Sequence, residues 1–121
     1  MALTSKQESR LEYLARLPEN WHESGLKHPI PNHEALTLAR EFTNAFPGDL
    51  ARAFRFYPMV EGGVSCESKH TDAEFMNDGS GALFIYNGDP GQEPIELHQS
   101  IARPFSMASK AYERLRSIEA G

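Results

Sequence analysis

The hydrophobic residues of this chain change their spacing along its length, and the changes divide it into helical and extended parts. The clearest helical pattern follows Asn32, where one apolar stripe recurs every three or four residues: Ala35, Leu38, Ala39, Phe42, Ala45 and Phe46. Asn32 can cap this helix through its side-chain oxygen, and Pro47-Gly48 ends it. A shorter helical pattern covers about residues 5–17, with a capping box at Thr4 and Gln7 or at Ser5 and Glu8, and ends before Pro18.

From about residue 54 the apolar period becomes two, which is typical of half-buried strands. In AFRFYPMV, one face holds Phe54, Phe56 and Val60, and the other holds Arg55, Tyr57 and Met59. Pro58 donates no backbone hydrogen bond, so this strand is an edge strand or ends there. After a turn at Gly62-Gly63 we expect four more extended segments: VSCES at 64–68, a short one at 73–76, ALFIY at 82–86, and a last one at 95–98. Because ALFIY is apolar throughout, we expect it to be a central strand covered on both faces.

A third helical stripe begins near Pro104, a residue favoured in the first turn of a helix. Its apolar positions are Phe105, Ala108, Ala111, Tyr112, Leu115 and Ile118. The element order is therefore α-α-β-β-β-β-(β)-α. Grouped strands with helices at both ends predict a single α+β domain over residues 1–121, with an antiparallel sheet of about four or five strands and helices packed on one face.

Charge and composition narrow the function classes. The chain has 17 acidic and 12 basic side chains and a formal net charge of −5, which argues against a nucleic-acid-binding surface. Cys66 is the only cysteine, so neither an internal disulfide nor a C-x-x-C metal motif is possible. The first ten residues, MALTSKQESR, lack the apolar core of a signal peptide, and ALFIY is too short to cross a bilayer. We expect a soluble cytoplasmic protein that makes no membrane contact.

The loop PENWHESGLKHP at 18–29 concentrates unusual residues. It holds the only Trp, Trp21, together with His22 and His28, and His33 follows shortly afterwards. These imidazoles could serve a metal-binding or hydrolytic site, but their spacing matches no known zinc motif. A large aromatic beside a turn more often plugs the end of a core, and Gly25 is suited to a positive φ angle. We therefore expect a structural corner and predict neither a metal nor a cofactor.

Catalytic chemistry finds little support elsewhere in the chain. Cys66 and His70 are the only nearby nucleophile–base pair, but four residues of extended strand separate them by about 13 Å. Cys66 also falls on the inward face of its strand and is best interpreted as a buried apolar residue. Asp72, Glu74 and Asp78 adjoin a turn signal and are interpreted as solvated charges. We therefore predict no catalytic residues.

Two glycine-containing turns carry a resemblance to a known family. The segment 17–25 with Pro29 and Pro31, and the segment EGGVSCE at 61–67, resemble small bacterial and phage proteins with an N-W-x-x-x-G-x-x-x-P turn and a G-G-[IV]-x-x-E strand. The likeness covers roughly residues 11–86. His22 and Glu23 stand where the family has Asp-Gly, and Ser68 stands where it has Trp. Because the family is mostly uncharacterised, the resemblance implies an α+β fold and an origin in a bacterium, phage or mobile element.

These observations predict a small non-enzymatic protein that binds another protein or protein complex as an inhibitor. An antitoxin, an immunity protein and an anti-defence protein such as an anti-CRISPR all fit, because such inhibitors need only a complementary surface. The alternatives are a small metal-binding or hydrolytic enzyme domain that uses the His-rich loop 22–34, and, less favoured, a nucleic-acid-associated regulator. We expect the partner to bind the sheet face away from the helices, through Arg55, Tyr57, Ser65, Glu67, Glu96 and His98.

Overall fold

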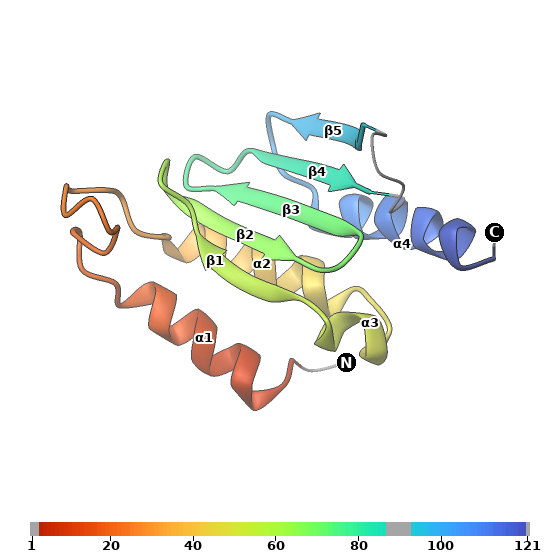
Figure 1. Ribbon diagram of the computed structural model, residues 1–121, viewed down its shortest axis with the longest axis horizontal. Coiled ribbons are helices and arrows are strands. Elements are labelled where there is room, and N and C mark those ends of the chain that lie inside the picture. Colours follow the sequence, from red (N-terminus) through yellow and green to blue (C-terminus); the bar gives the residue numbers. More distant parts are fainter. Residues whose placement is uncertain (1–2, 87–92, 121) are drawn as a thin grey trace.

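The computed structural model describes residues 3–86 and 93–120 and shows an α+β fold (Figure 1). Three helices come first: α1 (Ser5–Ala15), α2 (His33–Asn44) and α3 (Gly48–Arg52). Five strands follow: β1 (Arg55–Pro58), β2 (Gly63–Glu67), β3 (Thr71–Met76), β4 (Gly81–Ile85) and β5 (Ile95–Gln99). Helix α4 (Pro104–Ala120) closes the chain. This is the fold class that the sequence predicts.

The strands form one antiparallel sheet in the order β1-β2-β3-β4-β5, so each strand pairs with its neighbour in sequence. Tight turns join the first four strands. Gly63, at the start of β2, has a φ of +144°, and a Cβ atom at this position would lie 2.3 Å from the Phe75 carbonyl oxygen. Only glycine allows β2 and β3 to approach this closely, which explains the second glycine of the Gly62-Gly63 turn.

The core lies between one face of the sheet and the helices, as the strand alternation predicts. On β3, Thr71, Ala73 and Phe75 are buried, whereas Asp72 and Glu74 are only half-buried on the opposite face. Helix α2 packs against β2 and β3, α4 packs against β4 and α2, and α1 lies along β1 (Figure 1). The centre of the core is aromatic, with four fully buried rings: Phe42, Phe54, Phe56 and Phe75.

Helices α2 and α4 begin where the sequence indicates. The Asn32 side chain accepts a hydrogen bond from the Ala35 backbone N–H at 2.9 Å and so caps α2. Ala35, Ala39 and Phe42 of the predicted stripe are fully buried. Helix α3 is an addition that sequence reasoning missed. Pro47 does end the α2 pattern, but it also serves as the N-cap of a five-residue helix that is too short to show an apolar stripe.

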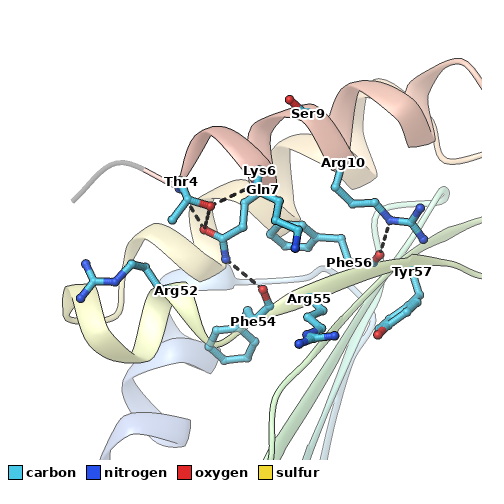
Figure 2. A pocket seen from close by; sticks show the side chains of 10 residues that line it. All are labelled: Thr4, Lys6, Gln7, Ser9, Arg10, Arg52, Phe54, Arg55, Phe56 and Tyr57. Atoms are coloured by element: carbon cyan, nitrogen blue, oxygen red, sulfur yellow. Dashed lines mark hydrogen bonds between the residues drawn. The ribbon is translucent and has the colours of Figure 1, made fainter.

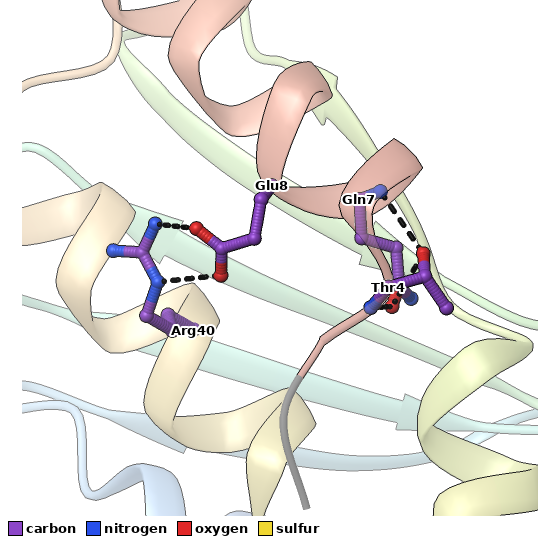
Figure 3. A network of polar contacts seen from close by, with 4 residues as sticks. All are labelled: Thr4, Gln7, Glu8 and Arg40. Atoms are coloured by element: carbon purple, nitrogen blue, oxygen red, sulfur yellow. Dashed lines mark hydrogen bonds and ion pairs between the residues drawn. The ribbon is translucent and has the colours of Figure 1, made fainter.

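Helix α1 is fixed to the rest of the molecule by polar side chains (Figure 3). Thr4 and Gln7 form the expected capping box. At the next residue of α1, the Glu8 carboxylate accepts two hydrogen bonds, of 3.1 and 2.8 Å, from the Arg40 guanidinium of α2. This Glu8 carboxylate raises the pKa of Arg40. A two-bond pair of this kind sets the angle between α1 and α2 more firmly than a single contact would.

Helix α1 also covers the outer edge of the sheet. The Gln7 side-chain amide donates to the backbone carbonyls of Ala51 and Phe54, at 2.9 Å each. The Arg10 Nε donates to the Phe56 carbonyl at 3.0 Å. Open strand edges invite pairing with other chains, and these contacts occupy carbonyls at the β1 edge.

Two sequence predictions about the strands are wrong in detail. The alternation predicted through residue 60 stops at Pro58, because the chain turns there: Met59 is 9% exposed, while Val60 is 40% exposed. The segment 82–86 does form a strand inside the sheet, β4, which pairs with β3 and β5. It is not covered on both faces, because Phe84 on the face away from the helices is only half-buried. An uninterrupted apolar run does not show how many layers cover a strand. Within the described ranges, no helix is long and apolar enough to span a membrane.

Candidate protein-binding surface

The sheet face away from the helices, here called the open face, brings together the residues that the sequence singled out. In the β1–β2 pairing, Arg55 lies directly opposite Glu67 and Tyr57 lies opposite Ser65. Glu96 and His98 lie on the same face, but on β5 at the other side of the sheet. The six predicted residues therefore form two groups on one face, and β3 and β4 separate them.

The centre of the open face holds residues that sequence reasoning did not assign to it. Asp72 lies opposite Glu67 on β2 and opposite Phe84 on β4. Glu74 lies opposite Ser65. The expectation that Asp72 and Glu74 are solvated charges beside a turn is wrong, because β3 begins at Thr71 and both side chains are half-buried on the sheet. The alternation in TDAEFM is the signal that places both carboxylates on the open face.

These central carboxylates are crowded by like charges. Partial burial raises the pKa of Asp72, and the neighbouring Glu67 carboxylate raises it further. Partial burial also raises the pKa of Glu74, with additional repulsion from Glu61, Asp72 and Glu67. Like charges placed opposite each other on neighbouring strands destabilise a sheet. The open face therefore keeps its acidic residues at a cost to folding.

Polar contacts hold two carboxylates of the open face in place. The Ser65 hydroxyl donates to the Glu67 carboxylate at 2.9 Å. At the far edge, the His98 imidazole lies 3.3 Å from the Glu96 carboxylate. Charged atoms that are held in place lose less freedom when a partner binds.

Aromatic rings flank the acidic centre on both sides. Tyr57 on β1 is 38% exposed and Tyr86, after β4, is 36% exposed. Phe84 packs edge-on against the His98 ring, with 5.7 Å between the ring centroids. Aromatic residues frequently anchor protein interfaces because they bury a large area with few rotatable bonds. The open face thus combines a central negative charge with aromatic anchors at its sides.

The His-rich loop is a compact corner of its own. The His22 and His28 rings lie 4.8 Å apart, and the Ser24 hydroxyl contacts both, at 3.0 and 3.3 Å. Gly25 has the expected positive φ, +74°. Trp21 packs against the core but is only half-buried, so it closes the core less completely than a full plug would.

The structure does not gather the imidazoles into a metal-ligand group. His33 lies apart from this pair, at the start of α2. In residues 3–86 and 93–120, no cluster of three or more His, Cys, Asp or Glu side chains is placed to hold a metal ion.

Cys66 is fully buried on the helix-facing side of β2, as expected. Burial raises the pKa of its thiol. His70, its only nearby candidate base in sequence, directs its Nδ1 to the Tyr86 backbone oxygen at 3.0 Å instead. A buried neutral thiol is a poor nucleophile, so this pair offers no catalytic arrangement.

Comparisons with known proteins leave the function open. The chain matches no protein-family model, no curated protein and no solved structure. The resemblance to small bacterial and phage proteins therefore stays a prediction.

Proposed function

We propose that this protein is a non-enzymatic inhibitor that binds a basic surface of another protein through its open face. The observation that carries the proposal is the row of carboxylates across the face: Glu67 on β2, Asp72 and Glu74 on β3, and Glu96 on β5. The opposing acids in this row weaken the sheet, and a positive partner surface would remove that repulsion on binding. Binding to a positive surface would explain why the carboxylates are grouped here, whereas the stability of the sheet would not.

The aromatic residues and the charge pattern together favour a protein partner. Tyr57 on β1 and Phe84, which lies between Asp72 and Glu96 on the neighbouring strands, offer apolar area next to the carboxylates, which suits the mixed composition of protein interfaces. A nucleic acid would be repelled by the same carboxylates. Antitoxins, immunity proteins and anti-defence proteins are the candidate classes within this proposal, because each acts by covering a functional surface of its target.

The proposal is tested by affinity capture with charge-matched variants. The open-face variant carries four substitutions: Glu67→Gln, Asp72→Asn, Glu74→Gln and Glu96→Gln. The control variant carries four at exposed acids elsewhere: Glu12→Gln, Glu19→Gln, Glu23→Gln and Glu113→Gln. Both variants change the net charge equally, so only the position of the charge differs between them.

We expect the wild-type protein and the control variant to capture the same basic protein from host lysate, and the open-face variant to capture at least about tenfold less of it. The captured protein should also lose its activity when the wild-type chain is added. Equal loss of capture with both variants would show that only net charge matters. Capture that instead depends on Lys110, Arg114 and Arg116 would move the interface to α4.

A further inference from the structure

A groove between α1 and β1 gathers positive charge in a protein that is negative overall (Figure 2). It has a volume of about 590 Å³, within the size range of small-molecule sites. Four basic side chains line it, Lys6, Arg10, Arg52 and Arg55, and its lining contains no acidic residue. A third of the 12 Lys and Arg side chains of the chain therefore converge on one concave surface.

Most of this positive charge is not neutralised by the protein itself. Arg52 forms an ion pair with Asp49. Within the described part of the chain, Lys6, Arg10 and Arg55 form no ion pair with a carboxylate. Basic groups that share a groove repel one another, and an anion bound between them would remove this repulsion.

The Arg10 guanidinium is held in place by contacts on several sides. Its Nε donates to the Phe56 carbonyl, and its guanidinium lies over the rings of Tyr13 and Tyr57, 5.1 and 5.9 Å from their centroids. The backbone contact uses Nε and leaves the two terminal nitrogens for a ligand. A guanidinium held in this way presents a planar pair of donors, which suits phosphate oxygens.

The surroundings favour a compact anion over a long one. A peptide strand cannot add to β1 here, because the carbonyls of Phe54 and Phe56 already accept hydrogen bonds from α1. A nucleic-acid strand that extends past Tyr57 would reach the carboxylates of the open face. A small phosphate-bearing molecule meets neither obstacle, and the exposed side of the Tyr57 ring could support an attached base.

We propose that the α1–β1 groove binds a compact phosphate-bearing anion, either a nucleotide or a free polyphosphate. Lys6, Arg10 and Arg55 contact the phosphate oxygens. Arg55 and Tyr57 border both this groove and the open face, but Lys6 and Arg10 belong to α1 and lie outside the open face, so substitutions there test the groove separately from the proposed inhibitor function.

The proposal is tested by isothermal titration calorimetry of the full chain with ATP, inorganic triphosphate and adenosine, without divalent metal. We expect ATP and triphosphate to bind with an affinity that falls as salt rises, and adenosine to show no binding. ATP binding tighter than triphosphate, with the difference lost in Tyr57→Ala, identifies a nucleotide. Equal affinities identify free polyphosphate.

The groove variant, Lys6→Gln with Arg10→Gln, should bind at least about tenfold more weakly. The control variant, Lys110→Gln with Arg114→Gln on α4, should bind like the wild-type protein. Among the residues that the structure describes, the Lys6 side chain makes no hydrogen bond or ion pair. Lys6→Gln alone should therefore still weaken binding about threefold, which separates binding from any effect of Arg10 on folding. The proposal fails if neither phosphate probe binds below about 1 mM, or if the groove and control variants lose affinity equally.

Discussion

Replacing Asp72 with asparagine should make the protein more stable, although it removes a charged residue from a strand. Asp72 lies directly opposite Glu67, and both side chains are half-buried. Two like charges that face each other on neighbouring strands lower the free energy of unfolding by about 0.2–1 kcal/mol. Because both side chains are partly exposed, solvent screens their repulsion, and we expect a value near the middle of that range. Asparagine keeps nearly the same shape and one side-chain oxygen, so the substitution removes mainly the charge. We therefore expect Asp72→Asn to raise the free energy of unfolding by about 0.5 kcal/mol, or the melting temperature by about 2 °C.

The raised pKa of Asp72 determines how its effect on stability changes with pH. The pKa of Asp72 is raised in the folded protein above its ordinary value of 3.8, so the folded state holds the proton more tightly than the unfolded state does. Ionisation of Asp72 therefore costs stability, and this cost is absent below about pH 3.8 and complete above the raised pKa. The stability advantage of Asp72→Asn should be present at pH 7 and should disappear as the pH falls through the raised pKa.

Thermal unfolding of wild type and variant, at pH 7 and at pH 3.5, measures this effect. Glu23→Gln in the exposed loop makes the same change in net charge and should leave the melting temperature unchanged. High salt should reduce the gain of Asp72→Asn, because the repulsion is partly screened. An unchanged or lower melting temperature at pH 7 would refute the argument that the open face keeps its carboxylates at a cost to folding.

Three further predictions concern the framework behind that face. Gly63→Ala should lower the free energy of unfolding in urea by more than about 3 kcal/mol, because the added Cβ would meet the Phe75 oxygen. Gly25→Ala has free space around its Cβ and should lower it only by the strain of the positive φ, about 1–2 kcal/mol. Phe42→Ala should cost about 3–5 kcal/mol in the same assay, because the ring is fully buried and has three other phenylalanine rings around it, with centroids 5.1–5.5 Å away. Cys66 should resist thiol reagents at pH 8 until the protein unfolds, because the thiol is buried and its pKa is raised; rapid labelling of the native protein would contradict its placement.

The sequence predicts the helices and the meander of this fold well because their signals are local. The stripe of α2, its Asn32 cap and the Gly62-Gly63 turn can all be recognised within a few residues. Helix α3 could not be found this way, because five residues are too few to show a period. The contacts of Gln7 and Arg10 with the β1 edge join residues more than 40 positions apart, and nothing local encodes them.

The candidate surface was predictable at its margins but not at its centre. Strand alternation alone places Arg55 and Tyr57 on the sheet face opposite the buried Phe56. That Glu67 faces Asp72 depends on the pairing register of β2 and β3, which the sequence does not show. The positive groove combines side chains from α1, α3 and β1, so it becomes visible only when these elements are placed in space.

Carboxyl footprinting of the complex with the captured partner tests the central claim most directly. A carbodiimide reagent labels accessible Asp and Glu side chains, and mass spectrometry compares the free and the bound protein. We expect Glu67, Asp72, Glu74 and Glu96 to lose labelling on binding, while Glu12, Glu23 and Glu113 are labelled equally in both states. Unchanged labelling of the four open-face carboxylates, with protection of Glu113 on α4 instead, would contradict it.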